Sequence, residues 1–143
     1  MSSLVPFILD SLSHNKTVEM KVSGNSMYPF LLDRLSSVIL SKPLNLKKGD
    51  IVLYKRNDDH YVLHRIISIN DDKLTYDIVG DNQYHVDKHV LKEVIIAKVI
   101  AYNRKGKGFK KNDSLYRLIF PVIRRVRYFG KRIVHYLKRF GGR

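Results

Sequence analysis

Three short segments of the chain carry residue types that could perform nucleophilic chemistry. The first is the string SGNSMYPFL at 23–31, where Ser26 follows an alternating, strand-like run within a glycine-containing turn. Such a turn can present a serine hydroxyl and a backbone N–H to a carbonyl group, because glycine permits tight backbone geometry. Serines in turns more often only cap or turn the chain, so this segment alone leaves both roles open.

The second segment places a histidine inside an apolar strand. His64 lies in the run VLHRII at 62–67. A histidine in these surroundings is either a partly buried core residue or a general base, since its near-neutral pKa suits proton abstraction from a hydroxyl. The third segment, VGDNQ at 79–83 followed by Asp87, is either an ordinary β-turn or the source of a carboxylate that orients the histidine.

Taken in order, these segments resemble the signal peptidase I family and its relatives, the self-cleaving repressor-type peptidases. The resemblance covers roughly 22–100, which is most of the body. The string GNSMYPFL at 24–31 resembles the nucleophile box, GDIV at 49–52 a second conserved strand, and GDN at 80–82 the closing Gly-Asp box. Three boxes in this order favour the catalytic interpretation of Ser26 over a plain turn.

Most bacterial members of the family use a lysine base in a segment that ends Lys-Arg. Here the aligned pair is His64-Arg65, as in the archaeal, endoplasmic-reticulum and sporulation-type signal peptidases. The resemblance therefore implies a Ser-His peptidase in which Ser26 attacks the scissile carbonyl and His64 transfers the proton. It also implies that Asp87 orients His64 and that Asp81 supports the site.

The resemblance further implies how a substrate binds. The peptide would add as a strand beside the nucleophile segment, with small residues near the cut. Met27 and Pro29 would shape its pockets, although simple packing explains them equally well. The backbone N–H of Ser26 would be one oxyanion donor, and because Gly24 stands where bacterial members carry a second donor serine, Asn25 is the remaining candidate. No cofactor or metal is implied, since Ser-His chemistry needs neither.

The elements that must position these residues are mostly strands. Short β-branched or aromatic runs, separated by turns rich in Gly, Asn and Asp, occur at 18–22, 37–40, 51–54, 61–69, 74–79 and 94–100. We therefore predict a mainly β fold of the signal-peptidase and repressor-peptidase type, built as an antiparallel sheet or partial barrel. Apolar residues at helical spacing within 4–12 predict a short N-terminal helix.

The chain divides into three predicted regions. A peptidase domain at 1–103 is followed by a Gly/Lys linker at 104–112 and a basic amphipathic helical tail at 113–143. In the tail, apolar residues recur every three or four positions with Arg and Lys between them, and we expect breaks near Pro121 and Gly130.

Charge is unevenly distributed along the chain. The formal net charge is +14, yet residues 1–103 carry 13 Lys/Arg against 12 Asp/Glu, whereas 104–143 carry 14 against the single Asp113. A basic segment of this kind binds phosphates, and its amphipathic, aromatic-rich pattern favours an anionic membrane surface over nucleic acid as the partner. A partner protein, or packing of a solvated helix back on the body, stays open as well. The absence of cysteine excludes disulfides, zinc-thiolate sites and cysteine nucleophiles.

The same patterns give an expected location and substrate. No apolar run reaches the roughly 18 residues that a membrane span requires, and the N-terminus lacks the positive region of a secretory signal. We therefore expect a cytoplasmic protein bound peripherally to the inner face of the membrane. The expected substrate is a precursor peptide or protein from which a signal or leader segment is removed.

Two other functions stay open at this stage. One is a non-catalytic module that uses the same groove and tail to hold peptides at a membrane. The other is a repressor-type autopeptidase whose basic tail binds nucleic acid. Only 25 residues precede Ser26, too few for a helix-turn-helix domain, and His64 stands where those relatives have a lysine.

Overall fold

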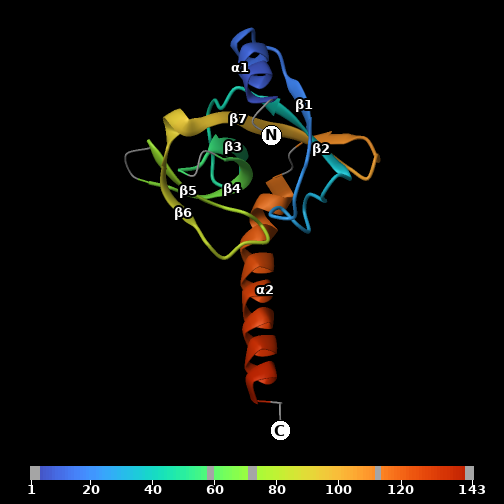
Figure 1. Cartoon of the computed structure of the whole chain (residues 1–143), viewed down its shortest axis with the longest axis vertical. Coiled ribbons are helices and arrows are strands. Elements are labelled where there is room, and N and C mark those ends of the chain that lie inside the picture. The colour runs from blue at the N-terminus through green and yellow to red at the C-terminus, as the bar shows by residue number, and fades with distance from the viewer. Residues whose placement is uncertain (1–3, 58–59, 71–73, 112–113, 141–143) are drawn as a thin grey trace.

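The computed structural model describes residues 4–57, 60–70, 74–111 and 114–140. These residues form an eight-stranded antiparallel sheet with a short helix near the N-terminus and a long helix near the C-terminus. The two helices lie at opposite ends of the β body (Figure 1). The mainly β architecture and the N-terminal helix confirm the sequence prediction at this level.

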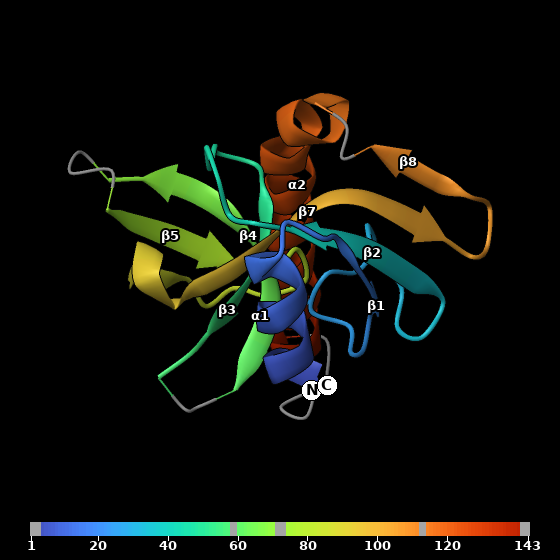
Figure 2. The same ribbon diagram turned by 90° about the horizontal axis from the view of Figure 1, so that it is seen from above.

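The strands are β1 (Val18–Lys21), β2 (Ser36–Ser41), β3 (Ile51–Lys55), β4 (Tyr61–Ile69), β5 (Thr75–Val79), β6 (Asp87–Leu91), β7 (Ile95–Arg104) and β8 (Phe109–Lys111). Their order in the sheet is β1-β2-β7-β3-β4-β5-β6, and β8 also pairs with β7. The long strand β7 crosses the middle of the body (Figure 2). Strand β2 pairs along one of its edges, whereas β3 pairs with its first part and β8 with its last part along the other edge. β7 therefore joins the two halves of the sheet.

Alternating side chains explain why these segments form strands. In β1, Val18 and Met20 are buried whereas Glu19 and Lys21 are exposed. The central strand β3 is buried on both faces, because successive residues of a strand point to opposite sides of the sheet. Its residues Ile51 and Leu53 join one core cluster, and Val52 and Tyr54 join the other.

The helices differ in how they meet this body. Helix α1 (Val5–Ser13) buries Ile8 and Leu12 in the first core cluster. Helix α2 (Ser114–Phe140) buries Phe120 near its start, and its C-terminal part extends clear of the strands (Figure 1). In the part of the chain that the structure describes, neither helix has the length and apolar character needed to cross a bilayer.

Two sequence-predicted features of the C-terminal region differ from the structure. Helix α2 continues without interruption past Pro121 and Gly130, where we expected breaks. Residues 104–111, predicted to belong to a linker, contain the end of β7, a turn and β8. Gly106 and Gly108 have φ angles of 70° and 87°, a conformation that glycine adopts readily, so the Gly-rich composition closes a hairpin here.

Candidate active site

Ser26 lies in the irregular segment that joins β1 to β2, and it is half-buried. Its neighbour Met27 is fully buried in the core, whereas Asn25 is exposed. The Tyr28 N–H donates to the Asn25 carbonyl (3.1 Å), which closes a turn around Ser26. The turn therefore fixes Ser26 at the boundary between the core and the surface.

Backbone geometry explains the glycine two residues before Ser26. Gly24 has a φ of 87°, in the left-handed region that favours glycine, and its N–H donates to Asp33 Oδ1 (2.8 Å). A serine at this position would be strained. Asn25, the sequence-predicted second oxyanion donor, instead has its carbonyl held by Asn82 Nδ2 (3.2 Å), and its side chain stays exposed.

His64 is in β4, opposite Val52 of β3, and only 2% of it is exposed. Its Nδ1 lies 3.3 Å from the hydroxyl of Tyr54, which donates its hydrogen to Asp87 Oδ2. Since a phenol has one hydrogen and that hydrogen goes to Asp87, the Nδ1–H of His64 must be the donor to Tyr54. The unprotonated nitrogen is then Nε2, which is the tautomer that a general base requires.

Asp87 begins β6 and reaches His64 through the Tyr54 hydroxyl, whereas we had expected it to orient His64 itself. It also pairs with Arg56, whose Nε lies 3.2 Å from Asp87 Oδ2. Tyr54 and Arg56 carry no local sequence signal from which we predicted a role. Pairing β3 with β4 about the Asn/Asp-rich turn between them would have placed Tyr54 and His64 on the same face of the sheet.

Burial sets the protonation state of His64. It lowers the pKa of His64 from 6.5 to about 4, with the negative charge of Asp87 acting in the opposite direction and Arg56 lowering the pKa further. The ring is therefore neutral at pH 7. A neutral ring with Nδ1–H held in place can accept a proton at Nε2.

Gly80 brings the nucleophile turn and the base together. A Cβ atom at Gly80 would lie 2.7 Å from the backbone oxygen of Ser26 and 3.1 Å from Nε2 of His64. Next to it, the Asn82 N–H donates to the Ser26 carbonyl (2.8 Å). The Gly-Asp box is thus packed between Ser26 and His64. Among the hydrogen bonds of the described residues, none joins the Ser26 hydroxyl to His64.

Asp81 does not face His64 but forms a buried ion pair with Arg65. The guanidinium donates to both carboxylate oxygens, at 2.9 and 2.8 Å, and the exposed fractions of the two side chains are 0% and 1%. A third bond runs from Arg65 to the carbonyl of Gly49 (2.9 Å). The rings of Phe30 and Phe120 lie 5.0 and 4.8 Å from the guanidinium carbon. Asp81 therefore holds together the segments next to His64 and Gly80 and does not itself bond to His64 in the described residues.

A small cavity of about 110 Å³ opens beside Ser26, lined in part by Met27, by Met20 and Val22 at β1, and by Val62 of β4. A water molecule occupies about 30 Å³ of liquid, so the cavity suits a small aliphatic side chain. Met27, which we expected to shape a substrate pocket, is one of its lining residues. Pro29, the other predicted pocket residue, is not among its lining residues; its carbonyl accepts a hydrogen bond from Arg104 (3.1 Å).

Helix α2 also contacts the site, through a residue that the sequence analysis had placed on the basic side of the tail. Arg127 donates to Asn82 Oδ1 (2.7 Å) and to the Tyr28 carbonyl (3.1 Å). Asn82 in turn holds the backbone of Ser26. No local sequence signal distinguishes Arg127 from the other arginines of the helix, because its partners lie far away along the chain.

Comparison with known proteins provides no relative from which a function could be transferred. No family model matches the sequence, and no curated protein matches it. Within the described ranges, no group of three or more His, Asp or Glu side chains is placed to hold a metal ion. The resemblance to signal peptidases therefore depends on the sequence segments described above and on no matched relative.

The packing of Gly80 leads to a stability prediction. Gly80→Ala should lower the free energy of unfolding by about 1–3 kcal/mol, because the new methyl group would meet the Ser26 backbone and the His64 ring. Gly130→Ala is the matched control: no atom lies within 4 Å of its added Cβ, and alanine should stabilise α2 by up to about 1 kcal/mol. Urea denaturation measures both. Equal stability of Gly80→Ala and wild type would contradict the close packing.

Proposed function

We propose that the protein is a serine endopeptidase that removes a signal or leader segment from a precursor peptide by Ser-His(-Asp) catalysis. The observation that supports this most is the state of His64. Its Nδ1–H is held by the Tyr54–Asp87 pair, its ring is neutral, and its Nε2 faces Gly80 beside the Ser26 backbone. A buried imidazole N–H needs a partner in any role, but here the partner engages Nδ1 and leaves Nε2, on the side of Ser26, as the proton acceptor.

In the proposed reaction His64 Nε2 takes the proton of Ser26 as the hydroxyl oxygen attacks the scissile carbonyl. Nδ1–H, Tyr54 and Asp87 stabilise the imidazolium that forms, as a carboxylate does in a Ser-His-Asp triad. His64 then returns the proton to the leaving amine. The Ser26 hydroxyl and His64 would form their hydrogen bond when the substrate closes the site, as catalytic hydrogen bonds often do.

The developing oxyanion needs donors aimed at its position. The backbone N–H of Ser26 is the first candidate. The exposed side chain of Asn25 is the second, since Gly24 offers no hydroxyl. Removing one such donor in other acyl-transfer enzymes lowers kcat by about 10²- to 10³-fold.

The substrate would bind in an extended conformation. Strand β1 stands at the end of the sheet order, where a peptide can add as a further strand. The cavity beside Ser26 lies between β1 and β4 and would receive one small side chain of that peptide. The proposed cleavage site therefore carries a small residue next to the scissile bond.

We place this reaction at an anionic membrane surface on the cytoplasmic side. Helix α2 exposes the apolar residues Val122, Val126 and Ile133, and the sequence of 114–140 contains no Asp or Glu. A basic amphipathic helix of this kind lies in the headgroup region with its apolar face toward the acyl chains. A precursor presented at the same surface would meet the active site there.

A second candidate function is a non-catalytic peptide-binding module. The observation that favours it is that the described hydrogen bonds include none between the Ser26 hydroxyl and His64. In this alternative the edge of β1, the small cavity and helix α2 bind a peptide, and Ser26 and His64 have structural roles only.

Cleavage by variants separates the two functions. Wild-type protein should cut precursor peptides encoded beside its gene at a single bond, and Ser26→Ala and His64→Ala should abolish cleavage while remaining folded. Ser13→Ala and His14→Ala, at exposed positions around the end of α1, are matched controls that should retain full activity. Mass spectrometry identifies the products. Equal binding without cleavage by all five proteins would support the binding module, whereas equal cleavage by all five would show that Ser26 and His64 take no part in the reaction.

The Tyr54 relay gives a second prediction. Tyr54→Phe keeps the ring but removes the hydroxyl that joins His64 to Asp87, so kcat should fall by roughly 10²-fold while KM changes little. Tyr102→Phe, at a half-buried tyrosine that packs against Phe30, is the control and should leave kcat unchanged. If Tyr54→Phe has wild-type kcat, the hydroxyl does not take part in catalysis.

The lowered pKa of His64 predicts the pH dependence. A general base works only when it is deprotonated, so activity is lost as the pH falls through its pKa in the folded protein. Because that pKa is about 4, kcat/KM should stay high well below pH 6.5 and decline only near pH 4. Initial rates between pH 3.5 and 8 test this. A decline centred near 6.5 would mean that His64 is not buried as described.

A further inference from the structure

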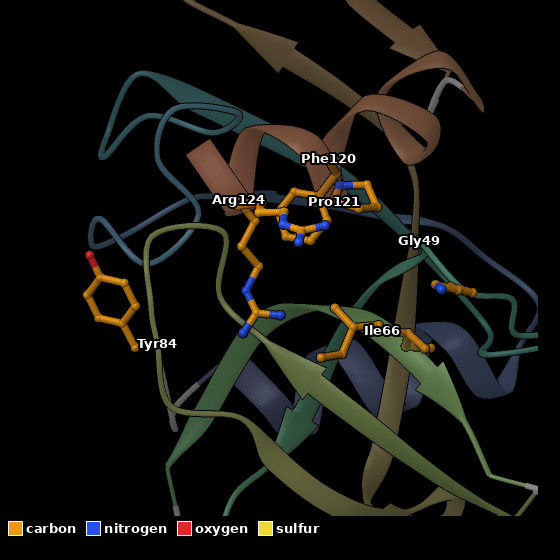
Figure 3. Close-up of a pocket in the computed structure, with 9 residues that line it drawn as sticks. Gly49, Ile66, Tyr84, Phe120, Pro121 and Arg124 are labelled. Atoms are coloured by element: carbon orange, nitrogen blue, oxygen red, sulfur yellow. The ribbon is translucent and has the colours of Figure 1, made fainter. Parts of the chain in front are cut away.

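A second cavity lies at the junction of α2 and the β body, apart from the small cavity at Ser26. Its volume is about 410 Å³, and its lining includes Ile66 of β4, Tyr84, and Phe120 and Arg124 of α2. Figure 3 shows the Arg124 side chain descending from the helix into the space between Ile66 and Tyr84. None of the residues assigned above to the reaction lines this cavity.

The cavity combines an apolar wall with a cluster of positive charges. Ile66 and Phe120 are buried and supply the apolar wall. Lys48, Arg124 and Arg125 supply three cations, and the ion pairs of the described residues include none of these three. An occupant must therefore offer both a negative charge and apolar surface.

An apolar strip continues from this cavity along α2. A shallow groove of about 750 Å³ shares Pro121 and Arg125 with the cavity and extends past Val126 and Phe129 to Ile133. At the helical rise of 1.5 Å per residue, the strip from Pro121 to Ile133 is about 18 Å long. One leaflet of a bilayer has a hydrocarbon depth of about 15 Å. The strip is thus about as long as one lipid acyl chain.

We propose that this junction binds one anionic phospholipid. Lys48, Arg124 and Arg125 bind its phosphate, and one acyl chain lies along the strip from Pro121 to Ile133. The inference rests on the membrane location proposed above and deepens it, but it does not depend on catalysis. Nucleic acid has phosphates without an attached hydrocarbon chain, and so would leave the strip uncovered.

A lipid in this position would hold the part of α2 that contacts the candidate active site. Arg124 and Arg125 lie within one helical turn of Arg127, which donates to Asn82 and to the Tyr28 carbonyl. Lipid binding and the catalytic loops therefore share one segment of helix. The bound lipid would orient the Ser26 turn relative to the membrane surface.

Lys48 provides the sharpest test, because it lies on the β body and not on α2. We would measure binding of the Ser26→Ala protein to phosphatidylglycerol/phosphatidylcholine vesicles and count lipids per protein by native mass spectrometry. Lys48→Ala should weaken vesicle binding about fivefold and remove the single bound phosphatidylglycerol. Lys47→Ala is the matched control: it removes an adjacent exposed lysine outside the cavity and should retain that lipid.

Further arms separate a lipid from other occupants. Val126→Ser, at an exposed position of the strip, should also lose the bound lipid. Equal effects of Lys48→Ala and Lys47→Ala would overturn the site in favour of a general attraction between charges. Binding of inorganic phosphate, an acidic peptide or a single-stranded oligonucleotide as tightly as the lipid, with the same dependence on Lys48, would overturn the lipid assignment. Because Ser26→Ala is used throughout, a failure of the proposed peptidase function leaves this result unaffected.

Discussion

The buried ion pair between Arg65 and Asp81 joins most of the segments that build the candidate site. It connects β4 to the Gly-Asp box, and Arg65 adds a bond to the Gly49 carbonyl and contacts with Phe30 and Phe120. Both charges are out of water, so loss of one partner would leave the other unpaired at a cost of about 3–5 kcal/mol. The requirement to keep this pair satisfied fixes the relative positions of five otherwise separate segments.

The candidate base, His64, is a sequence neighbour of this pair. His64 precedes Arg65 in β4. Because successive residues of a strand point to opposite faces, the guanidinium of Arg65 lies on one face of the sheet and the imidazole of His64 on the other. Gly80 likewise precedes Asp81 and contacts both Ser26 and His64. The ion pair thus holds in place the two residues next to it, His64 and Gly80, that border the Ser26 turn. Tyr54 and Asp87 complete the arrangement from the second face, where they determine which nitrogen of His64 carries the proton.

The same constraint ties the basic helix to the body. Phe120 packs on the Arg65 guanidinium near the start of α2, so the helix leaves the body from a fixed point. Farther along, Arg127 contacts the loops around Ser26, while Arg124 and Arg125 line the cavity toward the β body. A single helix therefore borders the candidate catalytic loops and the proposed lipid site. Much of the excess positive charge of the chain lies in this helix, so its arginines can contact both sites.

Local chemistry in the sequence was sufficient to predict most of the strands, the first helix and the amphipathic character of the C-terminal helix. Side-chain alternation and glycine turns act over a few residues, and their patterns are visible in the chain itself. The polar strand β6 and the hairpin at 104–111 were missed, because backbone pairing with a neighbour, and not apolar periodicity, stabilises them. The role of Tyr54 between His64 and Asp87, and the pairing of Asp81 with Arg65, depend on strand register across the sheet. Register is decided only when the whole sheet packs on its core. The tertiary structure alone therefore determined that Asp81 pairs with Arg65 and that Asp87 bonds to Tyr54.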